Sequence, residues 1–82
     1  MSGAPPEGWS IVDGALERTF ELESFPQAIE FVRRVADAAE EANHHPDIDI
    51  RYRSVTLRWW THSAGAITEL DHRLAARVNE LA

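Results

Sequence analysis

The sequence contains no cysteine and no lysine. Without cysteine, the chain has no disulfide, no thiol nucleophile and no cysteine-ligated zinc site. No apolar run approaches the ~18 residues of a membrane-spanning helix, and Met1–Trp9 lacks the basic and apolar regions of a secretory signal. We therefore expect a cytoplasmic protein without a membrane partner.

Positive charge is scarce as well. Eight arginines stand against 14 acidic residues, which gives a net charge of −6. A domain that binds nucleic acid carries a basic surface, so this balance argues against a nucleic-acid partner.

Large apolar side chains are few for a chain of this length. Hydrophobic residues make up 44% of the 82 residues, and 12 residues are alanine. The core of one chain is therefore thin, and burial against a second copy would stabilise it. We expect a flexible N-terminal tail over 1–8 and a single domain over 9–82 that assembles as a homodimer or homotetramer.

The first half of the domain is predicted to form a hairpin and then a helix. Strands over 9–12 and 16–22 flank Asp13-Gly14, a pair typical of a two-residue hairpin turn. Ser24 suits a helix N-cap, and the helix is expected to end at Asn43. The apolar stripe that predicts this amphipathic helix comprises Phe25, Ala28, Ile29, Val32, Val35, Ala36 and Ala39.

A second hairpin is predicted from the alternation of apolar and polar residues over 48–53 and 55–60. The turn is expected near Arg53-Ser54. If Tyr52 faces Val55, apolar side chains pair along one face, and an acidic residue meets an arginine on the other. This register is preferred because a slip of one residue would destroy both matches.

The last element is predicted to be a helix that begins near Thr68. Asp71 stands three residues later, in the pattern of a capping box. The apolar stripe of this helix comprises Leu70, Leu74, Val78 and Leu81. Two hairpins and two helices of this size predict an α+β fold, in which a four-stranded antiparallel sheet carries the helices on one face.

Three histidines hold the chemical content of the sequence. His44 and His45 precede the third strand, and His62 follows the fourth. In the preferred register His45 and His62 lie nearly opposite each other, so three imidazoles should gather at one edge of the sheet. Imidazoles suit general acid–base catalysis, and a carboxylate such as Glu40 or Asp71 can fix their tautomer.

These residues form a pattern that resembles the signature of the pterin-4a-carbinolamine dehydratase family. The resemblance covers most of the chain and includes Gly8-Trp9 and Thr61-His62. Two positions depart from it, because Asn43 stands where the family often has an acid and Leu70 where arginine is common. The matching elements, with the family's gaps between them, are Glu40, His44-His45-Pro46, Tyr52, His62 and Asp71.

The resemblance implies a dehydratase that removes water from a 4a-hydroxytetrahydropterin to give the quinonoid dihydropterin. The product would be recycled as the tetrahydrobiopterin-type cofactor of aromatic amino acid hydroxylases, and the reaction would use no metal and no organic cofactor. His44 and His62 would carry the proton transfers, with either as the acid, and His45 would hold the pterin and share charge. The residues expected to contact substrate or orient the imidazoles are Glu40, Asn43, Thr61, Asp71 and Trp9.

Simpler interpretations of the same residues exist. His44 and His45 could cap the helix and satisfy loop carbonyls. Asp71 could be a capping residue, Glu40 an exposed helix acid and Trp9 a core anchor. His72 matches no element of the pattern and is expected to be a solvated helix residue.

Two other functional classes are also consistent with the sequence. The first is a non-catalytic module of the same fold, serving dimerisation, assembly or transcription. The second is a zinc site, since three histidines can leave an open coordination position. The absence of an HExxH-type helical pair and the divergence of adjacent histidines argue against zinc.

Overall fold

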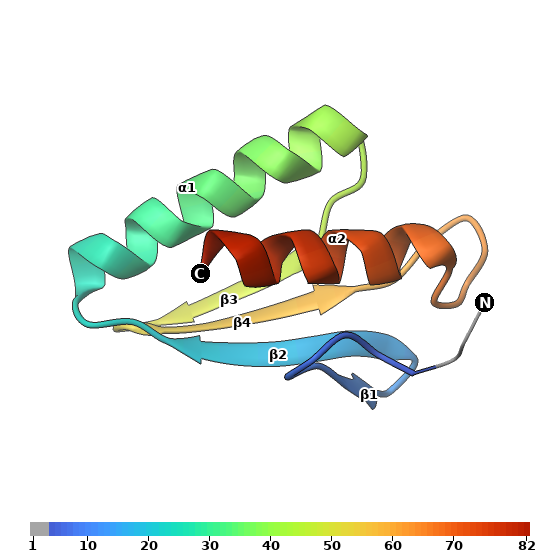
Figure 1. Ribbon diagram of the computed structural model, residues 1–82, viewed down its shortest axis with the longest axis horizontal. Coiled ribbons are helices and arrows are strands. Elements are labelled where there is room, and N and C mark those ends of the chain that lie inside the picture. The colour runs from blue at the N-terminus through green and yellow to red at the C-terminus, as the bar shows by residue number, and fades with distance from the viewer. Residues whose placement is uncertain (1–3) are drawn as a thin grey trace.

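The computed structural model describes residues 4–82. In chain order the elements are β1 (Ser10–Val12), β2 (Ala15–Glu21), α1 (Phe25–Ala42), β3 (Asp47–Arg51), β4 (Ser54–Trp59) and α2 (Glu69–Leu81). The strands form one antiparallel sheet in the order β1-β2-β4-β3, and both helices cover the same face of it (Figure 1). The predicted α+β fold is confirmed. No helix within residues 4–82 is both long and apolar enough to cross a bilayer.

The β1–β2 hairpin turns where the sequence predicted. Asp13 and Gly14 have φ values of 49° and 79°, as the mirror-image turns of tight hairpins require. On β2, Arg18 shares the core face with Phe20, which alternation alone would reserve for an apolar residue. Its guanidinium carbon lies 4.4 Å from the centroid of the Phe20 ring, so the aromatic face accommodates the charge.

Helix α1 begins as predicted, with Ser24 accepting a hydrogen bond from the backbone of the first turn. The predicted apolar stripe is wrong in part, because Phe25 and Ile29 are exposed while Phe31 is buried. The Phe31 ring contacts the Phe20 ring at a centroid distance of 4.9 Å, so this side of the helix faces the sheet. The buried positions of α1 are Ala28, Phe31, Val35, Ala38 and Ala39.

The predicted register of the β3–β4 hairpin is wrong by two residues. Val55 pairs with Ile50, and Tyr52 instead lies in the turn with φ 56°. The turn falls at 52–53 because Arg53 is bound to the end of β2. Its carbonyl accepts from the Leu22 N–H at 2.9 Å, and its guanidinium donates to the Leu22 carbonyl at 2.8 Å.

The corrected register preserves the two faces of the hairpin and changes the partners. Each side chain keeps its face, so apolar residues still pair with apolar residues. Arg58 lies opposite Asp47 rather than Asp49. Strand β3 is an edge strand, so Ile48 and Ile50 remain exposed although they lie on the helix-bearing side.

The segment before β1 is attached to the domain. Residues 1–3 of the predicted tail lie outside the described residues, but the Glu7 carbonyl accepts from Arg18 at 3.3 Å and from Asn79 at 2.9 Å. Next to it, the Trp9 indole N–H donates to Asn79 Oδ1 at 2.8 Å. Gly8 contributes by lacking a side chain, because a Cβ there would lie 2.6 Å from Arg18 Nη1. These bonds join the start of the domain to β2 and α2.

Candidate active site

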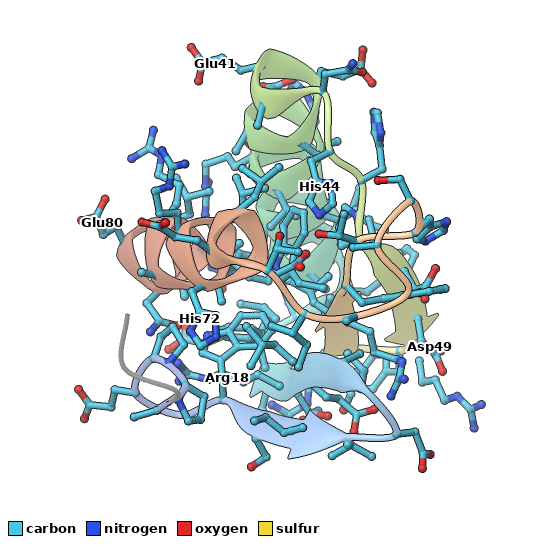
Figure 2. All side chains as sticks on the ribbon, turned by 90° about the vertical axis from the view of Figure 1, so that its right-hand side faces the viewer. Arg18, Glu41, His44, Asp49, His72 and Glu80 are labelled. Carbon is cyan, nitrogen blue, oxygen red and sulfur yellow. The ribbon has the colours of Figure 1, made fainter. Side chains whose placement is uncertain are left out.

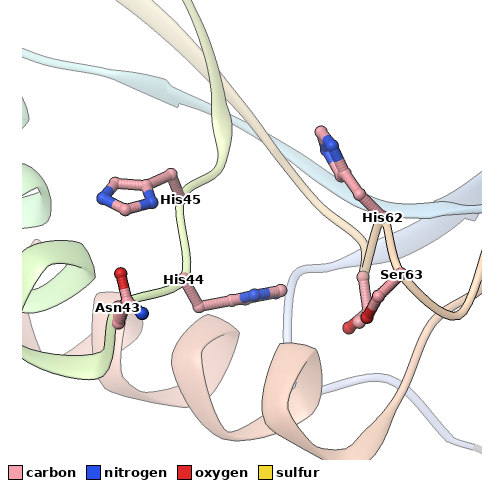
Figure 3. A pocket seen from close by; sticks show the side chains of 6 residues that line it. Asn43, His44, His45, His62 and Ser63 are labelled. Atoms are coloured by element: carbon pink, nitrogen blue, oxygen red, sulfur yellow. The ribbon is translucent and has the colours of Figure 1, made fainter.

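Three segments meet at the open end of the β3–β4 hairpin: the end of α1, the loop before β3 and the loop after β4. Together they form an open cavity of about 260 Å³. The residues that line it are Asn43, His44, His45, Thr61, His62 and Ser63 (Figure 3). The three predicted catalytic histidines and two of the predicted substrate contacts therefore share one cavity. Ser63 is an additional lining residue that the sequence pattern did not single out.

The end of α1 sets the direction of His44. Asn43 adopts a left-handed conformation with φ 52°, which asparagine tolerates better than most residues with a side chain. The backbone N–H of Asn43 donates to the Glu40 carbonyl, and that of His44 donates to the Ala39 carbonyl at 3.0 Å. The chain thus leaves the helix abruptly. Figure 2 shows the His44 side chain on the side of α2 away from His72.

His44 is held from two directions. Its ring lies nearly parallel to the indole of Trp59, with 13° between the planes and 5.8 Å between the centroids. Its Nε2 lies 2.6 Å from Oδ1 of Asp71. The His44 side chain is 12% exposed and that of Asp71 is fully buried, so the pair is largely shielded from water.

Asp71 uses its two carboxylate oxygens for different purposes. Oδ2 accepts from the Thr61 hydroxyl at 2.7 Å and from the Thr68 backbone N–H at 2.8 Å, which caps α2. Oδ1 is left for His44. The capping interpretation and the site interpretation of Asp71 are therefore compatible. With Nε2–H donating to Asp71, the ring's second nitrogen, Nδ1, is the one that can accept a proton.

His45 points away from His44 (Figure 3). The divergence follows from the alternation of side chains in an extended segment, which Pro46 favours at the residue before it. His45 Nε2 lies 2.5 Å from Glu40 Oε2, and the two side chains are 55% and 76% exposed. The predicted partnership of Glu40 with an imidazole is present, at the solvent-exposed rim of the cavity.

His62 lies on a tight loop that follows β4. The loop is closed by the Thr61 N–H, which donates to the Ala66 carbonyl at 3.0 Å, and by the Gly65 N–H, which donates to the Thr61 carbonyl at 2.9 Å. The His62 ring stacks on Trp60, with 4.0 Å between centroids and 28° between planes. Trp60 follows Trp59 in the chain, so the two indoles lie on opposite faces of the sheet and support different histidines.

Four residues singled out from the sequence do not line the cavity: Glu40 and Asp71, which bond to histidines that do, and Trp9 and His72. Trp9 is 4% exposed and packs edge-on against Phe20 at 6.0 Å, which corresponds to the core-anchor interpretation rather than to a substrate contact within this chain. His72 is half-buried on the first turns of α2. Over residues 4–82 no group of three or more histidine or acidic side chains is arranged to hold a metal ion.

Comparison with known proteins points to a single family. The family model described as pterin 4 alpha carbinolamine dehydratase matches residues 2–81. A relative from Herpetosiphon aurantiacus, named for the same dehydratase, is 57% identical over 74 residues, which are 90% of this chain and 77% of that protein. A relative of the same name from Mycobacterium sp. strain KMS is 49% identical and covers 99% of this chain and 88% of its own length.

Two solved structures share the fold. A Brucella melitensis protein described as a transcriptional coactivator/pterin dehydratase superposes with a TM-score of 0.89 at 36% identity, over 93% of this chain and 83% of that one. A pterin dehydratase-like protein described as a RuBisCO assembly factor of the alpha-carboxysome gives 0.79 at 25% identity, over 94% and 92%. Because the family model matches residues 2–81, nearly the whole length of this chain, the chain belongs to the pterin-4-alpha-carbinolamine dehydratase family.

Proposed function

We propose that this protein dehydrates a 4a-hydroxytetrahydropterin to the quinonoid dihydropterin by histidine acid–base catalysis. The observation that carries the proposal is the cavity lined by His44, His45 and His62, together with the hydrogen bond between His44 and the buried carboxylate of Asp71. The family supports the same reaction class.

The reaction needs an acid and a base within one small cavity. The C4a–O bond breaks, and the leaving hydroxyl takes up a proton and departs as water. The N5 proton is removed, and the electron pair of the N5–H bond forms the C4a=N5 double bond. No electrons are gained or lost, so a pair of imidazoles suffices and no metal or organic cofactor is required.

We assign the base to His44 and the acid to His62. His44 Nδ1 would take the N5 proton, and the adjacent Asp71 carboxylate would offset the positive charge that forms on the ring. His62 lines the same cavity from the loop after β4 and would protonate the leaving hydroxyl. His45, supported by Glu40, would hold the pterin together with the polar side chains of Asn43 and Thr61.

The test is a stopped-flow dehydration assay on a synthetic 4a-hydroxytetrahydropterin. His44→Ala and His62→Ala should each lower the rate by roughly 10²- to 10⁴-fold, the usual contribution of a general acid or base. His72→Ala is the matched control, because His72 does not line the cavity, and it should retain the wild-type rate. Wild-type rates in both cavity variants would refute the proposal.

The proposed place of the enzyme is in the recycling of a tetrahydrobiopterin-type cofactor in the cytoplasm. The quinonoid product is oxidised relative to the tetrahydropterin. A hydroxylase that uses a tetrahydropterin would supply the substrate, and a reductase would consume the product. An aromatic amino acid hydroxylase is the client that this chemistry favours.

We also propose that the protein forms a homodimer through the edge of β3. Among the described strands, β3 pairs with β4 alone, and a strand edge that stays free invites another chain. Antiparallel pairing of two copies about Asp49 would place Asp47 opposite Arg51 of the second copy and Ile48 opposite its Ile50. Opposite charges and apolar residues would then match on both sides of the centre, where the two Asp49 carboxylates face each other and each is paired with the Arg51 of its own strand.

Light scattering after size-exclusion chromatography tests the dimer. Ile50→Lys should shift the assembly toward monomers. Ile11→Lys is the matched control, because Ile11 is also exposed but lies on β1, at the other edge of the sheet. A monomeric wild-type protein, or equal behaviour of the two variants, would contradict this interface.

A second candidate function is that of an assembly module. It is favoured by the RuBisCO assembly factor that shares this fold and by the exposed isoleucines of β3. An assembly module would retain its function when His44 is replaced and lose it when Ile50 is. The dehydratase would instead lose activity when His44 is replaced and keep it when Ile50 is, because the cavity is formed within one copy of the chain.

A further inference from the structure

The three histidines of the cavity differ in what holds their rings. Carboxylates hold His44 and His45 through one ring nitrogen each. The His62 side chain makes no hydrogen bond to the residues described over 4–82, and its ring contact is the stack on Trp60. His62 is exposed, so without that stack several rotamers would be open to it.

Trp60 is itself oriented by the neighbouring strand. Its indole N–H donates to Asp47 Oδ2 at 3.3 Å. Asp47 is the first residue of β3, and both residues lie on the face of the sheet opposite the helices. The chain of contacts thus runs from the start of β3, through the indole, to a ring that lines the cavity.

We propose that Trp60 is a positioning residue for His62 in the dehydration reaction. This inference rests on the proposed function. The stack holds the plane of the imidazole and leaves both Nδ1 and Nε2 free, whereas a carboxylate partner would occupy one of them. An aromatic face also tolerates both the neutral and the protonated ring, so His62 can give up and regain a proton without losing its support.

The structural half of the proposal is tested without any activity. In a proton NMR spectrum, the ring current of Trp60 should displace the His62 ring protons upfield, relative to those of an unstacked histidine. The displacement should vanish in Trp60→Leu and persist in Trp60→Phe, which keeps an aromatic face. His62 resonances that are the same in wild type and Trp60→Leu would overturn the inference while leaving the proposed function intact.

The catalytic half is tested by a double-mutant cycle. Trp60→Leu should lower kcat by about tenfold with little change in KM, a fraction of what a general acid contributes, and Trp60→Phe should recover most of that loss. In a His62→Ala background, Trp60→Leu should have no further effect, because the residue acts through His62. If the losses of kcat in the two single variants multiply in the double variant, Trp60 does not act through His62 and supports the fold instead.

Asp47 offers a smaller and matched comparison. Asp47→Ala should lower kcat by about twofold, as expected for an exposed polar contact. Asp49→Ala should leave it unchanged, because Asp49 lies on the same face of β3 without a bond to the indole. Equal effects of the two variants would contradict the anchoring of Trp60 by Asp47.

An inactive wild-type enzyme would overturn the proposed function and the catalytic role of Trp60 together. The NMR comparison would still decide whether the His62 ring stacks on Trp60.

Discussion

The two sides of the cavity are built from similar parts in different surroundings. On the inner side, between the sheet and the helices, His44 stacks on Trp59 and bonds to a carboxylate that is fully buried. On the outer side, His62 stacks on Trp60, whose N–H reaches an exposed aspartate. Each side therefore contains a histidine, an indole and an acid, and water reaches only the outer side freely.

The comparison teaches that burial, rather than residue type, decides what each part contributes. In the interior, a hydrogen bond to a buried carboxylate is strong and its loss leaves unpaired polar groups. At the surface, the same kind of contact competes with water, so the acid on that side orients a neighbour and adds little stability. Substitutions on the two sides should differ accordingly.

Asp71→Ala should have the largest effect. It removes the partner of His44 and the shared acceptor of the Thr61 hydroxyl and the Thr68 N–H, two half-buried donors. We expect the dehydration rate to fall by roughly 10²- to 10⁴-fold and the free energy of unfolding to drop by about 1–3 kcal/mol. Stopped-flow kinetics and urea denaturation measure the two quantities, and a variant with wild-type values in both would contradict the buried His44–Asp71 pair.

The tryptophans should separate clearly in stability. Trp59 is fully buried, so Trp59→Ala should lower the free energy of unfolding by about 3–5 kcal/mol. Trp60→Ala should change it by roughly 0.5 kcal/mol or less, as surface substitutions do. Urea denaturation of the two variants provides the comparison. Similar losses would mean that the division into an inner and an outer side is wrong.

Glu40→Gln should have a small effect, because the Glu40–His45 pair is exposed. We expect a stability change of about 0.2–1 kcal/mol that diminishes at high salt. Chemical denaturation at low and high ionic strength checks it. A loss as large as that of Asp71→Ala would show that the exposed rim carries the energetics now assigned to the interior.

Removing metal ions should have the smallest effect of all. The proposed chemistry needs only imidazoles and their carboxylate partners, so dialysis against a chelator should leave the dehydration rate unchanged. A rate that falls on dialysis and returns with added zinc would restore the metal interpretation, with Nδ1 of His44 as a ligand while Nε2 stays bonded to Asp71.

Most of the fold follows from local signals in the sequence. The Asp13-Gly14 turn, the Ser24 cap and the Thr68–Asp71 capping pattern all stand where the sequence predicted them. The errors occur where a distant contact prevails. The second hairpin turns at 52–53 because β2 binds Arg53, and no property of the hairpin itself reveals that partner.

The candidate site was predictable in its membership and less so in its connections. His44 and His45 precede the second hairpin and His62 follows it. They therefore meet at its open end in either register, and they line one cavity although the predicted strand pairing is wrong. The indoles that stack on His44 and His62 were not predicted, since Trp59 and Trp60 are adjacent in the chain. Only their environments separate their roles.

The sequence by itself determined the elements, the hairpin ends at which the histidines gather and the family to which the chain belongs, because turns, caps and spaced motifs are local properties. The tertiary structure decided the strand register, the buried face of α1 and the pairing of each imidazole with its support. Those depend on which surfaces exclude water, and that is settled only when elements distant in the chain pack together.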